Sequence, residues 1–267
     1  MQLSTITGII ADMDGVLWRG SQPLPGLADF FDFLRAGGIP FVLATNNSSQ
    51  TPQAYLHKLS GMGVNGLAEN QIITSGTATA DYLQAAYPPG TPVHVLGGDG
   101  LKQIIRQAGF PPGQDEARVV VAGVDFDLTY AKLKHACALV RAGADFIGTN
   151  ADATFPLPDG LAPGAGSILA AMATATGRQP TIIGKPGAPM FQTALRRLGT
   201  SPEKTLMIGD RLNTDIEGAR RAGLKAALVL TGVTTREELA ASPIQPDGIY
   251  DGLPDLVAAW QRALAGE

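Results

Sequence analysis

The stretch Thr7–Trp18 reads Thr-Gly-Ile-Ile-Ala-Asp-Met-Asp-Gly-Val-Leu-Trp. Its first five residues form a short, mostly apolar run, and two acids, Asp12 and Asp14, follow that run. Apolar runs of this length are typical of buried parallel strands. Residues two apart in an extended segment project to the same side, so Asp12 and Asp14 are expected to point together at the carboxyl end of the strand. Open α/β sheets bind ligands at that end, and the site is therefore expected there.

Alternating strand and helix patterns extend outward from this stretch. A second apolar run, Phe41–Ala44, follows a helical pattern whose apolar side chains share one face: Leu27, Phe30, Phe31 and Leu34. Towards the C-terminus the pattern predicts a helix over 188–198, a strand over 205–208, a helix over 214–222 and a strand over 226–230. This alternation predicts an α/β fold, a Rossmann-like, doubly wound parallel sheet with helices on both faces.

The middle of the chain repeats the alternation on its own. Strands are expected near 93–96, 119–122 and 146–147, with helices near 101–108 and 130–140. Turn-rich stretches, Thr74–Gly76 and Gly177–Pro180, border this segment and are interpreted as hinges. We therefore expect residues 1–75 and 180–267 to form a core domain and residues 76–179 to form an inserted α/β domain. Residues 161–177 are too short for a membrane span and are interpreted as a loop followed by a buried helix.

Composition excludes several classes of protein. The chain has 267 residues, 45% of them hydrophobic and 16% charged, which indicates one large or two modest folded domains rather than disorder. The 20 basic and 24 acidic residues are mixed, so neither nucleic acid nor a membrane is expected as a partner. The single cysteine, Cys137, is interpreted as a small buried side chain and suits a reducing compartment. No signal-peptide pattern precedes Asp12, so a cytoplasmic location is expected.

Polar or charged residues also follow three other predicted strands. Thr45–Ser49 offers short polar side chains and backbone N–H groups that suit either a bound anion or a helix-capping loop. Lys185 stands between a glycine and a proline after a β-branched pair, either as a surface lysine or at the ligand edge of a sheet. Asp210 follows an apolar strand directly, and Asp215 stands where a carboxylate would also stabilise a helix start.

The acid pair on the first strand suggests a metal. Two neighbouring carboxylates repel each other in a partly dry cleft unless a proton or a cation neutralises them. A divalent ion that prefers oxygen ligands, Mg²⁺ above all, is the simplest partner for Asp12 and Asp14. The alternative is that Asp14-Gly15 forms only a turn.

Taken in chain order, these motifs resemble the haloacid dehalogenase superfamily of phosphotransferases. The matching segments are Asp-x-Asp-Gly-Val-Leu from Asp12, Thr-Asn-Asn-Ser from Thr45, Gly-Lys-Pro around Lys185 and Gly-Asp-x-x-x-x-Asp from Gly209. Residues 148–156, 160–167 and 231–233 are similar to the branch with a large α/β cap of the C2 type, which contains the NagD-like and p-nitrophenylphosphatase-like phosphatases. The resemblance covers nearly the whole chain and implies a phosphatase that acts on small phosphorylated metabolites.

The resemblance also implies a role for each motif. Asp12 would be the nucleophile that forms an aspartyl-phosphate, and Asp14 would be first the general acid and then the general base. Thr45 and the backbone of Asn46 would bind phosphoryl oxygens, and Lys185 would lie against Asp12 and the phosphate and counter the developing charge. The expected metal-binding residues are Asp12, Asp14 through its backbone carbonyl, Asp210 and Asp215, the last more remotely. Val16, Leu17 and Trp18 are expected to pack beside the site without a chemical role.

Substrate contacts implied by the resemblance come from the motif loops and the cap. The expected substrate-binding residues are Thr45, Asn46, Asn47, Lys185, Asn150, Asp152, Phe155 and Asn213. Asp152 would bind a hydroxyl or amine of the leaving group, or else serve only in a turn or tether. Phe155 stands where vitamin B6 phosphatases of this family have a histidine, which disfavours pyridoxal phosphate. Caps in this branch often form dimer contacts, so a homodimer through the cap is one arrangement that the resemblance implies.

Two other classes of function are open. A non-catalytic module could bind phosphate and Mg²⁺, or accept a phosphoryl group on Asp12, with the same fold. Asp14 would have no use in such an acceptor, and response-regulator receivers lack a long insertion. A dinucleotide-dependent enzyme is disfavoured because Gly97–Gly100 lacks the Gly-x-Gly-x-x-Gly spacing.

Overall fold

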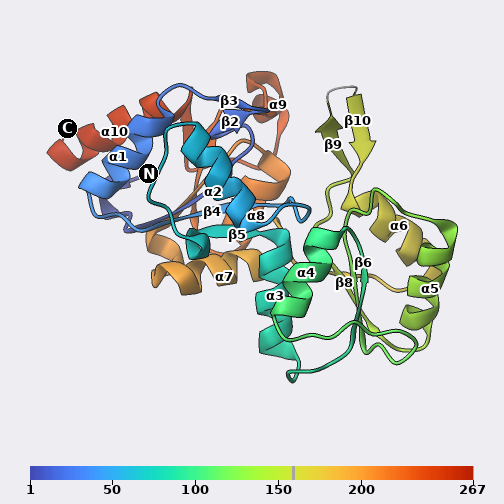
Figure 1. Ribbon diagram of the computed structural model, residues 1–267. Helices are drawn as coiled ribbons and strands as arrows, with labels where there is room; N and C mark the ends of the chain where they lie inside the picture. The colour runs from blue at the N-terminus through green and yellow to red at the C-terminus, as the bar shows by residue number, and fades with distance from the viewer. Residues whose placement is uncertain (158–159, 267) are drawn as a thin grey trace. The chain divides into compact units, whose positions relative to one another are not determined.

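The structure, a computed structural model, describes residues 1–157 and 160–266 (Figure 1). It divides into two compact units, each with its own sheet and core. Unit 1 comprises Met1–Thr45, Pro52–Ile73 and the chain from Phe191 onward, and unit 2 comprises Asn46–Thr51 and Thr74–Met190. Unit 2 therefore extends beyond the limits of 76 and 179 that we expected for the insertion.

Unit 1 is built on a six-stranded sheet in the order β14-β13-β12-β1-β4-β5. Its strands are β1 (Gly8–Ala11), β4 (Phe41–Thr45), β5 (Ile72–Thr74), β12 (Thr205–Gly209), β13 (Lys225–Val229) and β14 (Gly248–Tyr250). The neighbours from β14 to β4 pair in parallel. In chain order the first strand lies in the middle, with the second and third on one side and the later three on the other. This is the Rossmann order, and the predicted fold class is confirmed.

The order of this sheet reverses between β1 and β12. In open α/β sheets ligands bind at such a reversal, outside the carboxyl ends of the strands. The register pairs Ala11 with Ile208, and the backbone N–H of Asp12 continues the ladder by donating to the Ile208 carbonyl at 2.8 Å. Asp12 and the residues after Gly209 therefore leave neighbouring strands at the same edge.

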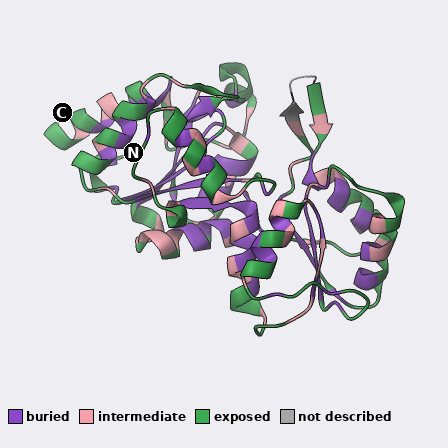
Figure 2. Cartoon of the chain, in the orientation of Figure 1, coloured by how far each residue is buried: buried purple, intermediate pink, exposed green. Residues whose placement is uncertain are grey.

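Helices cover this sheet because its central strands have apolar residues on both faces. They are α1 (Leu27–Ala36), α2 (Pro52–Gly61), α8 (Glu217–Arg221), α9 (Arg236–Ala241), α10 (Leu253–Ala265) and most of α7 (Ala188–Leu198). The expected face of α1 is buried, and the helix ends before Gly37-Gly38 as predicted. Figure 2 shows the buried strands at the centre of the unit. Where one helix was predicted over 214–222, a π-helical turn, η4 (Leu212–Ile216), precedes α8.

Unit 2 contains a second sheet, in the order β11-β8-β7-β6, whose strands are all parallel. Its strands are β6 (Val93–Leu96), β7 (Val119–Ala122), β8 (Asp145–Gly148) and β11 (Thr181–Ile182), and its helices are α3 (Ser75–Ala86), α4 (Asp99–Gln107), α5 (Tyr130–Arg141) and α6 (Ala165–Thr176). Cys137 on α5 is buried in the core of this unit, as predicted. Because β11 pairs with β8, the segment before Lys185 belongs to this sheet.

Two local predictions were wrong. Thr74–Gly76 is not a turn, because β5 runs directly into α3, whose first turn is closed by a capping box between Thr74 and Thr77. The segment before α6 is not a loop, because β9 (Thr154–Leu157) and β10 (Gly160–Pro163) pair as an antiparallel hairpin. Within the described residues, no helix has both the length and the apolar character that a membrane span requires.

Candidate active site

Three buried carboxylates meet at the reversal point of the first sheet. Oxygen atoms of Asp12, Asp210 and Asp215 all lie within 4.8 Å of one another. Asp12 follows β1 and is 8% exposed, whereas Asp210 after β12 and Asp215 in η4 are fully buried. The sequence placed these acids on separate motifs, and the parallel pairing of β1 with β12 brings them together.

Two glycines make room for Asp210 in this cluster. A Cβ atom on Gly15 would stand 2.5 Å from the Asp210 Oδ2 atom, and one on Gly232 would stand 1.9 Å from it. Gly15 also has a φ of +87°, which side chains rarely adopt. The Val233 N–H donates to the same oxygen at 2.7 Å and fixes the carboxylate. The loops after β1 and β13 are thus shaped around Asp210.

Asp215 organises the loop that carries Asp210. Its Oδ2 atom accepts the backbone N–H groups of Asp210 at 3.2 Å and of Arg211 at 3.0 Å. Gly209 permits this close approach, because an added Cβ atom would lie 2.2 Å from the Cβ of Asp215. One carboxylate oxygen of Asp215 is therefore engaged in holding the turn after β12. Asn213, a predicted substrate-binding residue of the same π-helical turn, is exposed.

Asp14 differs from the other acids because it is exposed and lies outside the carboxylate cluster. Its Oδ1 atom accepts a hydrogen bond of 2.7 Å from the indole Nε1–H of Trp18. The Nζ atom of Lys58 lies 4.1 Å from the centroid of the same indole ring. Burial lowers the pKa of the Lys58 ammonium, and the charge of Asp14 acts in the opposite direction. Sequence reasoning expected Trp18 only to pack beside the site and did not single out Lys58.

Thr45, the last residue of β4, is buried in unit 1 next to the strand that carries Asp12. The other predicted residues of its motif belong to unit 2. Of these, Asn47 uses its side-chain oxygen to accept the Ser49 backbone N–H at 2.8 Å and the Ser49 hydroxyl at 2.7 Å. The Asn47 side chain therefore closes the turn after Asn46.

Asn46 is the centre of a hydrogen-bonded network within unit 2. Its side-chain oxygen accepts the backbone N–H of Lys185 at 2.8 Å, and its Nδ2 atom donates to the Lys185 carbonyl, also at 2.8 Å. The same Nδ2 atom lies 3.1 and 3.2 Å from the two carboxylate oxygens of Asp152. The Asn46 carbonyl accepts hydrogen bonds from the Ser75 hydroxyl at 2.5 Å and from Asn150 Nδ2 at 2.7 Å. Four predicted or neighbouring polar residues are thus joined to one asparagine.

Gly184 allows Asn46 to reach the Lys185 backbone. An added Cβ atom at Gly184 would stand 2.6 Å from Asn46 Oδ1 and 2.8 Å from the Thr149 carbonyl. Lys185 itself is 2% exposed. A surface lysine, which was the alternative interpretation of this residue, is therefore wrong.

Phe155 on β9 is partly exposed, and its ring meets Phe126 edge-on at a centroid distance of 5.9 Å. Phe126 is 68% exposed, so this aromatic pair lies at the surface of unit 2. Phe155 therefore adds a partly exposed apolar group three residues after Asp152.

The donor set of the carboxylate cluster fits Mg²⁺. Three buried carboxylates offer only hard oxygen ligands, with neither histidine nor cysteine in the group of described residues. Hard divalent cations prefer this chemistry, and Mg²⁺ is typically held by one or two carboxylates together with water and phosphate oxygens. The cluster carries a formal charge of about −3 when ionised, so a cation would also relieve repulsion among its members.

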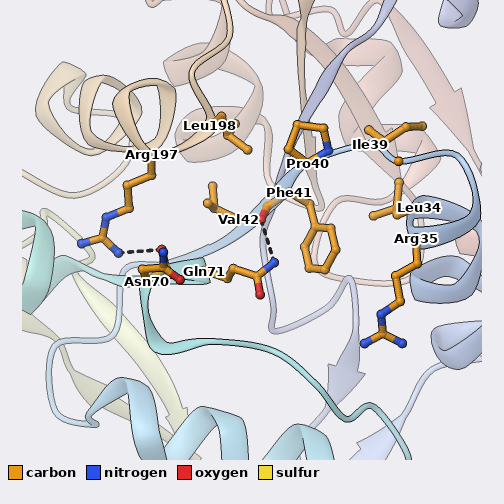
Figure 3. A pocket seen from close by; sticks show the side chains of 11 residues that line it. Leu34, Arg35, Ile39, Pro40, Phe41, Val42, Asn70, Gln71, Arg197 and Leu198 are labelled. Atoms are coloured by element: carbon orange, nitrogen blue, oxygen red, sulfur yellow. Dashed lines mark hydrogen bonds between the residues drawn. The ribbon is translucent and has the colours of Figure 1, made fainter.

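One cavity of unit 1 lies away from the carboxylate cluster. It has a volume of about 320 Å³ and is lined by the start of β4, with Pro40, Phe41 and Val42 between Arg35 and Arg197 (Figure 3). Thr45 marks the opposite, carboxyl end of the same strand. This cavity is therefore separate from the carboxylate cluster, and its apolar floor suits packing rather than phosphoryl chemistry.

Comparisons with known proteins match nearly the whole chain. A model of the haloacid dehalogenase-like hydrolase family matches residues 9–111, and a second model of the same kind of hydrolase matches residues 182–256. The chain is 36% identical over 255 residues to the 5'-nucleotidase YutF of Bacillus subtilis, covering 96% of this chain and 99% of that protein. It is also 36% identical over 254 residues to an acid sugar phosphatase of Staphylococcus aureus, covering 95% and 97%.

Solved structures agree with the sequence matches. The crystal structure of 4-nitrophenylphosphatase from Thermotoga maritima superposes with a TM-score of 0.93 at 36% identity. The superposition covers 98% of this chain and all of the other. Both units of the chain are therefore present in this neighbour.

Proposed function

Because the chain belongs to the haloacid dehalogenase-like hydrolases, in their branch of NagD-like phosphatases, and is a phosphoric monoester hydrolase, we propose a specific reaction. It hydrolyses small phosphorylated metabolites with the help of Mg²⁺, through an aspartyl-phosphate on Asp12. The observation that carries this proposal is the buried cluster of Asp12, Asp210 and Asp215 at the reversal point of the sheet.

In this proposal Asp12, Asp210 and the backbone carbonyl of Asp14 hold Mg²⁺, while Asp215 stabilises the loop of Asp210. When bound, the ion neutralises the carboxylate cluster and the charge of the phosphoryl oxygens. The hydrogen bonds from the Asp210 and Arg211 backbone to Asp215 support this division between the two acids. Such outer contacts orient the groups that bind a metal.

Asp12 begins the reaction as the nucleophile. A carboxylate oxygen of Asp12 forms a bond to phosphorus while the bond from phosphorus to the ester oxygen breaks. Asp14 donates its proton to the departing oxygen, so an alcohol leaves instead of an alkoxide. The exposure of Asp14, in contrast to the burial of Asp12, suits a residue that exchanges protons with the leaving group and with water.

Asp14 also serves the second half of the reaction. Its carboxylate removes a proton from a water molecule, whose oxygen attacks phosphorus. The bond between phosphorus and Asp12 then breaks, which releases inorganic phosphate and restores the Asp12 carboxylate. One difficult displacement is thus divided into two easier ones.

The remaining site residues bind and orient the phosphoryl group and its leaving group. Thr45, the Asn46 backbone and Lys185 counter the charge that spreads over the phosphoryl oxygens. Asn47 and Asn213 serve at the margin of the phosphoryl site. Asp152 and Asn150 recognise the leaving group, and Phe155 offers it an apolar contact. The two-point pairing of Asn46 with Lys185, and the contact of Asn46 with Asp152, support one connected network for both tasks.

The substrate class is a sugar phosphate, a nucleotide or a related metabolite. Two relatives of equal identity are called a 5'-nucleotidase and an acid sugar phosphatase, so overall similarity does not separate these substrates. In this chain the cap loop combines a carboxylate on Asp152 with the apolar ring of Phe155. That pairing favours a leaving group with both hydroxyls and an apolar face.

The proposal is tested by phosphate release from p-nitrophenyl phosphate. The wild-type protein should release phosphate with Mg²⁺ and lose this activity in excess chelator. Asp12→Asn should abolish turnover, by roughly 10⁴-fold or more, because the amide cannot act as the nucleophile. Melting temperature and phosphate binding checked in parallel would show that the variant is folded.

A matched control is Asn70→Asp, an exposed change between the same two residue types in unit 1. It should leave turnover within about twofold of the wild type, as surface substitutions usually do. Turnover that survives Asp12→Asn, or that is indifferent to the chelator, would contradict the proposal. Phosphate binding without any turnover in the wild type would favour a non-catalytic acceptor.

A further inference from the structure

Trp18 makes a specific contact with the carboxylate proposed to move protons. Its indole Nε1–H donates to Asp14 Oδ1 at 2.7 Å, a short bond for a neutral donor and a carboxylate. Indole nitrogen is a donor only, so the hydrogen atom has one possible direction. Asp14 is exposed, whereas Trp18 is fully buried. An exposed carboxylate is therefore tied to a buried donor.

Two side chains, Tyr55 and Lys58, contact the indole ring. Its plane lies 19° from that of Tyr55, at a centroid distance of 6.3 Å. Lys58 Nζ lies 4.1 Å from the ring centroid, within the range of a cation–π interaction. Tyr55 and Lys58 are both on α2, so this helix sets the position of the donor.

The backbone of Trp18 closes the same turn. The Gly15 N–H donates to the Trp18 carbonyl at 2.8 Å, and the Leu17 N–H donates to the Met13 carbonyl at 2.8 Å. Trp18 therefore holds the Asp14 segment twice, through its main chain and through its ring. Packing alone would not need the N–H group of the ring.

We propose that Trp18 is a positioning residue for phosphoryl transfer, which holds Asp14 Oδ1 so that Oδ2 is the oxygen that exchanges the proton. This inference rests on the proposed function, in which Asp14 is the general acid. As the bond from phosphorus to the ester oxygen breaks, the proton on Oδ2 passes to that oxygen. Without the indole N–H, the carboxyl group can rotate, and the proton is less often directed at the leaving group.

Leaving groups differ in how much they need that proton. The p-nitrophenolate ion is a stable anion and leaves without a proton, whereas an alkoxide is strongly basic and needs one. The ratio kcat/KM reports the steps up to departure of the leaving group and is independent of the later hydrolysis of the aspartyl-phosphate. A positioning role therefore predicts a loss that depends on the substrate.

The experiment compares Trp18→Phe with the wild type on p-nitrophenyl phosphate and glycerol 3-phosphate, with Mg²⁺. Phenylalanine keeps an aromatic ring beside Tyr55 and Lys58 but has no N–H. General acid catalysis contributes about 10²- to 10⁴-fold, so misdirecting the proton should lower kcat/KM for glycerol 3-phosphate by roughly 10- to 100-fold. For p-nitrophenyl phosphate the loss should stay within about threefold.

Trp260→Phe is the matched control, because these are the two tryptophans of the chain. Trp260 is buried and packs edge-on against Phe33 at 5.7 Å. Its indole makes no hydrogen bond within the described part of the chain. This variant should lower both values of kcat/KM equally and by less than about threefold, with a melting temperature similar to that of Trp18→Phe.

A second variant removes only the N–H group. Replacing Trp18 with β-(3-benzothienyl)alanine substitutes sulfur for the indole N–H and keeps the shape of the ring. If Trp18→Phe folds poorly, this variant gives the same comparison of kcat/KM on the two substrates. An equal loss on both substrates, or none on either, would overturn the positioning role. The proposed function fails if Asp12→Asn remains active on either substrate. The role of Trp18 fails if Asp12→Asn is inactive as expected but Trp18→Phe shows no difference between the two substrates.

Discussion

Asn46 shows how one side chain can join separate segments of unit 2. Its carboxamide has one acceptor and two donor hydrogens, and the structure uses both kinds. The oxygen and one N–H pair with the Lys185 backbone, and the other N–H reaches the Asp152 carboxylate. In the proposed reaction Lys185 opposes phosphoryl charge, which requires a fixed position, and Asn46 holds the backbone of that lysine.

Asn46→Asp should therefore lower kcat by roughly 10²-fold, because misplacement of a charged group by about 1 Å can have that effect. The new carboxylate would lose both donors and would face Asp152 and the Lys185 carbonyl. Steady-state kinetics on p-nitrophenyl phosphate measure the loss. Asn65→Asp is the control. The exposed Asn65 side chain accepts a hydrogen bond from the Ser60 hydroxyl through its oxygen, and an aspartate at this position can accept the same bond.

The double variant Asn46→Asp/Asp152→Asn tests the contact directly. It exchanges the two groups, so the bond between positions 46 and 152 can form again in the opposite direction. The kcat of the double variant should be at least tenfold higher than the product of the two single-variant effects predicts. A coupling of this size is typical of side chains in contact. A double variant as poor as the product of the two single variants would contradict the pairing.

At the level of single residues, the motif acids, Thr45 and Lys185 could be chosen from the sequence because each follows an apolar strand. Trp18 could not, since its aromatic side chain in an apolar run reads as core. Its polar contact depends on a turn that places residues 14 and 18 together. The glycines at 15, 209 and 232 did carry a signal in the sequence, since each stands next to an acid or within a motif. Sequence reasoning did not use this signal to infer a close approach to Asp210 or Asp215.

Among the elements, β6 carries a histidine with an unusual environment. The His94 ring lies 4.8 Å from that of His135, and its Nδ1 atom lies 3.3 Å from the Gly113 carbonyl. Burial lowers the pKa of His94 below its ordinary value of 6.5, and the charges of His135 and Lys102 act in the same direction. The Gly113 carbonyl opposes this shift.

The free energy of unfolding should therefore fall as pH falls below 6.5. A base with a lower pKa in the folded chain binds its proton more readily when unfolded, and acid then favours the unfolded state. Chemical denaturation between pH 7 and pH 5 measures the slope, and His94→Gln should make it shallower. His57→Gln, at an exposed position of α2, should leave the slope as in the wild type; an equal change in both variants would contradict the assignment.

Most elements could be predicted because their apolar periodicity is strong. The strands at 93–96 and 119–122 and the helix at 188–198 have the expected bounds. The hairpin of β9 and β10 could not be predicted, because its prolines and glycines are more typical of loops. The start of α3 was misread for a similar reason, since Ser75-Gly76 looks like a turn until Thr74 is seen to cap the helix.

Across the whole molecule, the two units have different limits from those that the strand and helix pattern and the turn-rich stretches suggested. Residues 46–51 and 181–190 belong with the second sheet, although their motifs read as parts of the first. The reason is local: β11 pairs with β8, and Asn46 pairs with the Lys185 backbone. Strand pairing between distant segments is set by three-dimensional packing, which periodicity along the chain does not specify. The cytoplasmic location and the homodimer remain predictions.

The central claim is that Asp12 becomes covalently phosphorylated. The most direct measurement is a crystal structure of the protein with Mg²⁺ and beryllium fluoride, which mimics a phosphoryl group on a carboxylate. We predict a beryllium fluoride adduct on the Asp12 carboxylate, with Mg²⁺ bound by Asp12 and Asp210. An unmodified Asp12, with the adduct absent or attached to another residue, would contradict the account.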